Sequence, residues 1–105
     1  MVKQFEIYWV DLNPTKGAEM QKIRPCVIVS PDELNQHLGT VIIIPITSSI
    51  HHYPFRVECT LLDRKGEIAT DQIRTIDKSR LKNKITVLSS EEKEGLRDVL
   101  MQMFQ

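Results

Sequence analysis

The sequence predicts one small, β-rich domain of the α+β class. Its 105 residues suit a single domain, residues 1–105, that buries about 60 to 70% of its unfolded surface without disulfide or metal crosslinks. Most apolar residues fall in short runs between turn-forming residues, either alternating with polar residues or continuously β-branched, as strands do. Only two segments begin with the polar residues that cap a helix.

The first two strands are predicted on either side of a long loop. Residues 5–10 alternate apolar and polar side chains, which favours a strand with one buried face. A turn at Asn13-Pro14 and a flexible Gly17 open a connection of about a dozen residues, and loops of that length in small domains are commonly functional or mobile. Residues 25–29 are continuously apolar, which predicts a strand buried on both faces.

A short helix is predicted directly after the second strand. Ser30 at the N-cap, Pro31 as the first helical residue and Glu33 in a capping box form the start of that helix. Gly39 is well placed to end it. Residues 41–47 then form an apolar third strand that emerges into polar residues at its end.

The second half is predicted to contribute a hairpin, a final strand and a closing helix. Residues 55–62 alternate as a strand, residues 63–66 resemble a four-residue hairpin turn, and residues 67–74 form the partner strand. A short helical turn at residues 77–80 precedes a strand at residues 85–88.

The closing helix begins at a second capping box, formed by Ser89 and Glu92. Its apolar residues recur with helical spacing along one face. They are Leu96, Val99, Leu100 and Met103.

The charges balance overall but not along the chain. Fourteen basic and fourteen acidic residues give a formal net charge of zero, so nucleic-acid binding would require cations gathered on one face. A basic run and an acidic run support such a separation, although either is equally consistent with a solvated surface. The basic run contains Arg74, Lys78, Arg80, Lys82 and Lys84; the acidic run contains Glu91, Glu92, Glu94 and Asp98.

The two cysteines, Cys26 and Cys59, both lie within predicted strands, where cysteine usually acts as a small core hydrophobe. The sequence has no signal-peptide pattern and no apolar run of about 20 residues that a membrane span requires. We therefore expect a soluble protein of the reducing cytoplasm, with no membrane association.

The stretch 16–30 carries a candidate anion site. A polar loop leads through Arg24-Pro25 into an apolar strand. Proline disfavours helical backbone at the preceding residue, so Arg24 is expected to be extended at the mouth of the strand. A guanidinium held there beneath a loop is suited to a phosphate.

Four segments in this order resemble the MazF/PemK family of toxin ribonucleases. The first runs from Tyr8-Trp9 through Asn13-Pro14 and Gly17-Ala18-Glu19 to Arg24-Pro25; the others are Pro45-Ile46-Thr47-Ser48, Tyr53-Pro54-Phe55 and residues 71–77. The resemblance spans nearly the whole chain. It implies an SH3-like half-open barrel of the CcdB/PemK type, with one helix after the second strand and one at the C-terminus.

The resemblance also implies an mRNA interferase of a type II toxin-antitoxin system. Such an enzyme cuts single-stranded messenger RNA at a short sequence, without a metal or other cofactor, by attack of the 2′-hydroxyl. The products carry a 2′,3′-cyclic phosphate and a 5′-hydroxyl. A homodimer is expected, silenced by a MazE-like antitoxin with an acidic disordered tail, and DNA would be contacted only through that antitoxin.

The resemblance assigns the chemistry to Arg24 and Thr47. We expect Arg24 to stabilise phosphate charge rather than act as a base, because a guanidinium stays protonated in proteins. Thr47 is expected to donate a hydrogen bond or relay a proton. RNA-binding roles are implied for Lys16, Glu19, Lys22, Ser48, Gln72 and Arg74, with Gln72 and Arg74 expected on one face of a shared strand.

Two further features limit what the resemblance implies. His51 and His52 are adjacent in a loop and point in different directions, so we expect no catalytic pair there, and no spacing of His, Cys, Asp and Glu predicts a zinc site. The segment 20–23 replaces the glycine-rich approach to Arg-Pro of common family members, so the cleavage sequence cannot be carried over.

Two alternatives remain open from the sequence. CcdB-like toxins share this architecture but bind DNA gyrase without catalysis, and fold does not determine function. The chain is also compatible with an inactive interaction module on the same scaffold. The pair Arg24 and Thr47 favours the nuclease over the gyrase binder.

Overall fold

Seven strands and two helices make up the fold in the computed structural model, which describes all residues, 1–105. The strands are β1 (Glu6–Asp11), β2 (Ile23–Ile28), β3 (Thr40–Thr47), β4 (Val57–Leu61), β5 (Arg64–Ile68), β6 (Arg74–Asp77) and β7 (Leu81–Val87). The helices are α1 (Asp32–His37) and α2 (Ser90–Met103), and short 3₁₀ turns lie at Thr70–Gln72 and Lys78–Arg80.

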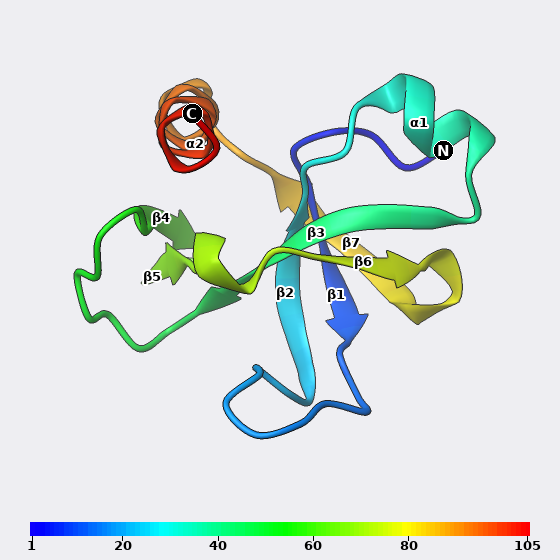
Figure 1. The fold of residues 1–105 in the computed structure, drawn as a ribbon, viewed down its shortest axis with the longest axis horizontal. Coiled ribbons are helices and arrows are strands. Elements are labelled where there is room, and N and C mark those ends of the chain that lie inside the picture. Colours follow the sequence, from blue (N-terminus) through cyan, green and yellow to red (C-terminus); the bar gives the residue numbers. More distant parts are fainter.

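Strand β3 is the centre of the sheet. The strand order is β4-β5-β3-β2-β1-β7, with β6 also paired to β3, and every pairing is antiparallel. The first half of β3 pairs with β6 and its last two residues pair with β5. Because one strand serves two partners in turn, the sheet bends around β3 into a half-open barrel (Figure 1), as the sequence predicts.

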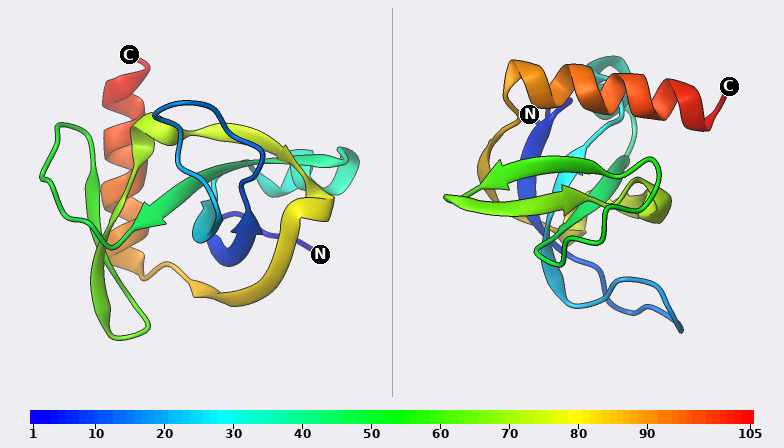
Figure 2. Two further views of the ribbon diagram at one scale, coloured as in Figure 1. Left: turned by 90° about the horizontal axis from the view of Figure 1, so that it is seen from below. Right: turned by 90° about the vertical axis from the view of Figure 1, so that its left-hand side faces the viewer.

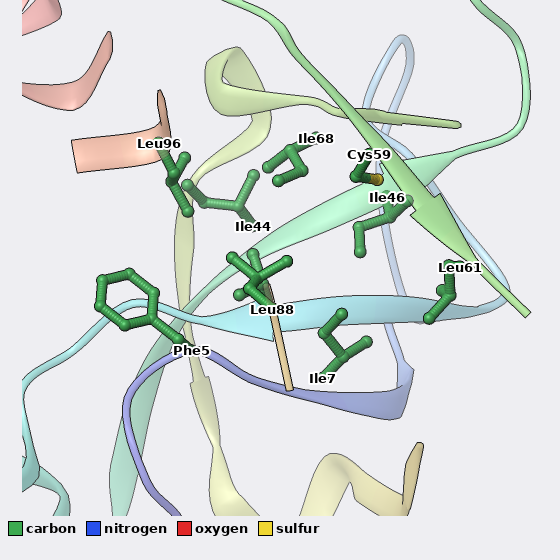
Figure 3. Packing of buried hydrophobic residues seen from close by; sticks show 10 residues of the cluster. Phe5, Ile7, Ile44, Ile46, Cys59, Leu61, Ile68, Leu88 and Leu96 are labelled. Carbon is green, nitrogen blue, oxygen red and sulfur yellow. The ribbon is translucent and has the colours of Figure 1, made fainter. Parts of the chain in front are cut away.

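Hydrophobic clusters lie on both faces of the bent sheet. The larger one gathers side chains from β1 to β5 and Leu96 of helix α2, which points toward Ile44 (Figure 3). The second one lies on the opposite face and contains Cys26 and Val41. Strand β2 is therefore buried on both faces, as expected, and β1 is as well, although its alternation predicts only one buried face. Both cysteines are free and buried, also as predicted.

The two predicted capping boxes have different outcomes. The box at Ser89 and Glu92 is confirmed, with both reciprocal hydrogen bonds present. The box at Ser30 is wrong: Pro31 is the N-cap of α1 and no side chain caps it. The hydroxyl of Ser30 donates instead to Asn35 Oδ1 (2.6 Å) and accepts from the backbone N–H of Ile42 (3.0 Å). This serine is needed to bind the helix to strand β3, so it is not available as a cap.

The hairpin is tighter than the sequence predicts. Strands β4 and β5 are joined by only Leu62 and Asp63, which both have positive φ, as a type I′ turn requires. The predicted partner strand, 67–74, is also wrong in extent. Strand β5 ends at Ile68, a 3₁₀ turn follows, and Arg74 begins β6, which pairs with β3. The final strand β7 begins at Leu81, four residues earlier than predicted.

Helix α2 lies across one end of the sheet, and the β1–β2 loop (residues 12–22) extends from the opposite end (Figures 1 and 2). Neither helix is long and apolar enough to cross a membrane.

Candidate active site

The largest cavity has a volume of about 630 Å³ and opens at the ends of β2 and β3. Its lining combines cations, hydroxyls and apolar side chains. The lining residues are Trp9, Lys22, Ile23, Arg24, Pro25, Ile46, Thr47, Ser48, Leu61, Leu62, Arg64, Lys65 and Gly66. Four predicted site residues, Lys22, Arg24, Thr47 and Ser48, therefore lie in one cavity.

The pairing of β2 with β3 explains why Arg24 and Thr47 meet. Cys26 lies opposite Pro45 in the antiparallel register. Continuing that register by two residues in each strand places Arg24 opposite Thr47. Side chains two residues apart point to the same face of a strand, so the side chains of Arg24 and Thr47 share the face that carries Cys26 and Pro45. Pro45 also lines a smaller cavity together with Arg74.

Arg24 is held by one contact and free for another. Its Nε donates to the carbonyl oxygen of Gln21 (3.0 Å), and its two terminal nitrogens make no hydrogen bond or ion pair within the protein. The proline after it holds the backbone extended, and Arg24 lies in β2. The guanidinium therefore keeps two parallel donors for a ligand.

Thr47 is buried and its hydroxyl is oriented. Its Oγ1 accepts the backbone N–H of Ser49 at 3.1 Å. Because the lone pair on that side is occupied, the hydroxyl proton remains free to be donated. Behind it, a Cβ added at Gly66 would lie 2.8 Å from the carbonyl oxygen of Thr47, so only glycine permits this close approach.

The cavity concentrates positive charge in a chain of zero net charge. Four cations line it, Lys22, Arg24, Arg64 and Lys65, and no acidic residue does. None of these four side chains forms an ion pair, since all four ion pairs of the protein involve other residues. Cations are therefore gathered in one cavity, but none of the four comes from the predicted basic run: Lys22 directly precedes β2 and Arg24 lies in it, and Arg64 and Lys65 lie in β5.

Three arginines hold the β1–β2 loop against the sheet. Arg74 donates to the carbonyl oxygen of Leu12 (3.3 Å), and Arg80 donates to those of Asp11 (3.3 Å) and Asn13; Arg24 contributes its bond to Gln21. These contacts fix the loop beside the cavity. They also give Arg74 and Arg80, two members of the basic run, a structural contact each with this loop, made through Nη1.

A second, smaller cavity of about 250 Å³ collects the other predicted RNA-binding residues. Glu19, Gln72 and Arg74 line it together with Met20 and Asp71, and Pro45 and Ile73 complete the lining. Gln72 accepts the backbone N–H of Met20 at 3.3 Å. Gln72 lies in a 3₁₀ turn and Arg74 in β6, so the prediction that they share a strand is wrong, yet the turn still brings both to one cavity.

The remaining predicted residues have simpler positions. Lys16 is exposed and lines neither of these two cavities. Its backbone N–H donates to Glu19 Oε1 (2.7 Å), which closes the tip of the loop. No group of three or more His, Cys, Asp and Glu residues is placed to hold a metal ion.

Three cavity residues were not predicted from the sequence. Trp9, which is 37% exposed, Arg64 and Lys65 all line the main cavity. The alternation of residues 5–10 places Trp9 on the same face as Phe5 and Ile7, which predicts that it is buried, and the predicted turn at residues 63–66 contains both cations. If the two-residue turn at Leu62 and Asp63 had been recognised, the sequence would have predicted Arg64 and Lys65 within a strand. It would still not have shown that this strand lies beside Arg24.

The thiol beneath the arginines is unreactive. Burial raises the pKa of Cys26 to about 12, although the neighbouring positive charges of Arg24 and Arg74 act in the opposite direction. Burial, together with the carboxylates of Glu92 and Glu67, also raises the pKa of Cys59 to about 12. Neither cysteine forms a thiolate near neutral pH.

The fold and cavity define a class of protein: a small half-open barrel whose main opening is a cationic, hydroxyl-bearing cavity suited to a phosphate-bearing ligand. Comparison with known proteins gives the family. The family model of PemK-like, MazF-like toxins of type II toxin-antitoxin systems matches residues 3–104. The chain belongs to this family.

Individual relatives agree with that assignment. The endoribonuclease MazF of Staphylococcus saprophyticus is 37% identical over 106 aligned positions, which cover 95% of this chain and 88% of that protein. MazF from Deinococcus radiodurans superposes with a TM-score of 0.85 at 25% identity, over 98% of this chain and 96% of that one. An endoribonuclease from a mycobacterial species was solved in complex with its cognate antitoxin. It superposes with a TM-score of 0.84 at 20% identity, over 99% of this chain and 95% of that one.

Proposed function

We propose that this protein is an endoribonuclease toxin that cuts single-stranded messenger RNA at a short sequence, and that Arg24 and Thr47 carry the reaction. The observation behind the proposal is that a guanidinium with two unpaired terminal nitrogens and an oriented hydroxyl lie on one face of the paired strands β2 and β3. The family match supports an RNA-cleaving toxin. It favours this activity over the gyrase-binding alternative.

The proposed reaction uses the substrate's own 2′-hydroxyl. The 2′-oxygen attacks the adjacent phosphorus, the bond to the 5′-oxygen breaks, and a 2′,3′-cyclic phosphate and a 5′-hydroxyl result. The terminal nitrogens of Arg24 form two parallel hydrogen bonds to the phosphate and stabilise the charge that develops on it. The 2′-hydroxyl loses its proton as its oxygen attacks, and the departing 5′-oxygen gains one; Thr47 hydrogen-bonds the phosphate or relays this proton from one oxygen to the other, and so keeps its own hydroxyl. In this scheme the reaction needs no metal.

The second cavity is proposed to bind bases next to the cleaved bond. Glu19 and Gln72 present carboxylate and amide groups there, which recognise base edges, and Arg74 supplies a cation for phosphate. The exposed Lys16 lies on the same loop and would contribute at longer range.

The proposed partners are a second copy of the chain and an antitoxin. One relative was solved with its cognate antitoxin, and MazE-MazF complexes are known from Deinococcus radiodurans. An acidic disordered tail would be attracted by the same unpaired cations as RNA and would compete for the main cavity. We place the activity in the cytoplasm, where messenger RNA is translated.

The test is cleavage of a long transcript in EDTA, with both fragment ends identified. The proposal requires cleavage at discrete sites that persists in EDTA, with 2′,3′-cyclic phosphate and 5′-hydroxyl ends. Replacing the attacking 2′-hydroxyl by hydrogen at a mapped site should abolish cleavage there. Activity that needs a divalent cation, or that leaves a 5′-phosphate, would disprove the mechanism.

A further inference from the structure

An aromatic stack lies exposed on the β3–β4 loop (residues 48–56), directly after the strand that carries Thr47. The rings of His51 and Tyr53 stack with their centroids 5.0 Å apart and an interplanar angle of 14°. Both residues are exposed, Tyr53 at 52%. Apolar ring surface of this size is normally buried in the folded chain, so an exposed and ordered stack needs an explanation.

The stack rests on a buried charge network. The Arg56 guanidinium carbon lies 4.8 Å from the centre of the Tyr53 ring, in cation–π range. The Arg56 side chain is only 8% exposed and forms two hydrogen bonds to Asp71, Nε to Oδ1 (2.9 Å) and Nη2 to Oδ2 (3.1 Å). Its Nη1 lies 3.5 Å from Glu67 Oε1. The cation beneath the rings is therefore held from two sides.

Glu67 connects this network to the loop backbone and to Thr47. Its side chain is 1% exposed, and its Oε2 accepts the backbone N–H of His52 at 2.7 Å. Burial alone would raise the pKa of Glu67, but the backbone N–H groups of His52 and His51 and the Arg56 guanidinium lower it below its ordinary value. Glu67 also lies opposite Thr47 in the pairing of β5 with β3, so the loop is anchored one strand away from the proposed catalytic hydroxyl.

The loop backbone is held in a strained form. His52 and Phe55 have φ values of 56° and 67°, a left-handed conformation that is unfavourable for residues other than glycine. Such conformations persist where surrounding contacts impose them, and they occur preferentially at functional sites. Here the buried Glu67 carboxylate and Arg56 impose them.

We propose that the His51–Tyr53 stack is a platform on which one unpaired base of the substrate RNA stacks, next to the cleaved phosphate. This inference rests on the proposed function. Single-stranded RNA is bound through aromatic rings that stack with splayed bases, and a rigid platform loses little entropy when the base arrives. The platform adds affinity and positions the chain beside Thr47, without taking part in proton transfer.

The two histidines therefore have different roles. His51 presents its ring to the base, whereas His52 uses its backbone N–H to bind Glu67, and its Nδ1 lies 3.3 Å from Glu58. The sequence prediction that they point in different directions is consistent with these contacts.

The test is a binding comparison on an RNA that spans a mapped cleavage site and carries a 2′-deoxy substitution at the attacking position, so that it is not cut. Affinity is measured by fluorescence anisotropy for the wild type, Tyr53→Ala, Tyr53→Phe and His51→Ala. Loss of one stacking contact should weaken binding by about 5- to 150-fold in His51→Ala. Tyr53→Phe keeps the ring that supports His51 and should bind as the wild type does, and Tyr53→Ala, which removes that support, should lose affinity in the same direction.

RNAs with a single abasic nucleotide locate the stacked base. At one position next to the cleaved bond, removal of the base should weaken wild-type binding and should remove the difference between wild type and Tyr53→Ala. In cleavage assays Tyr53→Ala should raise KM and leave kcat nearly unchanged. His37→Ala, which changes an exposed histidine of α1 away from this loop (Figure 1), is the matched control and should behave as the wild type.

The outcomes separate this inference from the proposed function. If the wild type cleaves RNA but Tyr53→Ala and His51→Ala both bind with unchanged affinity, the platform is wrong and the nuclease stands. An equal loss of affinity for every abasic RNA would also overturn the platform, because no single base would then be the one that stacks on it. If the wild type itself neither binds nor cuts RNA, the proposed function fails and the platform fails with it.

Discussion

At the scale of single residues, Arg24 combines a structural and a chemical contact in one guanidinium. Its Nε holds the β1–β2 loop through Gln21, while the terminal nitrogens have no partner within the protein. A planar group with separate donors makes this possible, whereas a lysine ammonium offers one point charge. The residue thus ties the position of the loop to the position of the charge.

Replacing Arg24 tests this division of roles. Arg24→Ala should lower the cleavage rate by about a hundred- to a thousand-fold, because one preorganised donor to the transition state is lost. Arg24→Lys should recover only part of the activity, since it lacks the two parallel donors. Rates are measured on a short RNA with a mapped site, and thermal unfolding serves to verify the fold. A fully active Arg24→Ala would place the active site elsewhere.

Gly66 is a second residue whose role follows from geometry. An added Cβ would lie 2.8 Å from the Thr47 carbonyl oxygen, a backbone atom that cannot move aside easily. Gly66→Ala should therefore lower the free energy of unfolding by about 1 to 3 kcal/mol, measured by urea denaturation. Gly39→Ala is the control, because nothing lies within 4 Å of a Cβ there. Equal stability of the two variants would contradict the crowding argument.

At the scale of elements, the two helices differ in how they begin. Helix α2 begins with a complete capping box, whereas α1 has no side-chain cap and is bound to the sheet through Ser30 and Asn35. A capping box depends on residues three apart in the chain, so the sequence predicts it well. The use of Ser30 depends on strand β3, which local pattern does not reveal.

The capping box gives a prediction for stability. Ser89→Ala removes the hydroxyl that accepts the N–H of Glu92 (3.1 Å) and should reduce the free energy of unfolding by about 1 kcal/mol. Ser90→Ala, which changes the next residue inside the helix, should have a much smaller effect. Chemical denaturation followed by circular dichroism compares the two. A larger loss in Ser90→Ala would mean that the cap is not where the stability lies.

At the scale of the whole molecule, zero net charge is reached by separating charges rather than mixing them. The main cavity has four cations and no anion, while carboxylates are used elsewhere in ion pairs and hydrogen bonds. The Arg56 hydrogen bonds lower the pKa of Asp71, and the pKa values of Glu67 and Glu6 are lowered as well. These carboxylates link the stability of the fold to pH.

The sign of this linkage predicts acid sensitivity. A carboxyl whose pKa is lowered by folding stabilises the native state at neutral pH, and this contribution is lost as the pH falls through the lowered pKa. The free energy of unfolding should therefore decrease below about pH 4. Glu67→Gln should be less stable than the wild type at neutral pH, and the difference should shrink in acid. A difference that is constant across a pH series of urea denaturation curves would refute the assignment.

Exposed apolar side chains at the start of β2 and at the β4–β5 turn, at the edge of the main cavity, predict a homodimer that leaves the cavity open to RNA. Ile23 and Leu62 are 54% and 63% exposed and line the cavity with Trp9. Large exposed apolar patches mark interaction surfaces, and a symmetric pair of chains would cover both copies. Sedimentation equilibrium at micromolar concentration should give twice the monomer mass of 12.2 kDa. A monomer mass there would reject the dimer.

Local pattern by itself determined much of this protein. The strands β1 to β4, the α2 cap, the buried cysteines and the resemblance to the family all follow from residues close together in the chain. Part of the candidate site could also be predicted from the sequence, because Arg24 and Thr47 lie in short motifs and meet through the pairing of neighbouring strands.

Only the tertiary structure decided which residues join them. Arg64 and Lys65 reach the cavity because β5 pairs with the end of β3. The predicted strand 67–74 is interrupted by the 3₁₀ turn Thr70–Gln72 because the residues after that turn form β6, which pairs with the first half of β3. The network of Arg56, Glu67 and Asp71 likewise joins residues 4 to 15 positions apart in three different elements. The periodicity of a strand predicts the side of the sheet on which each side chain lies. It does not predict which distant strand will pair with that strand. That depends on how a bent sheet closes, a property of the whole chain.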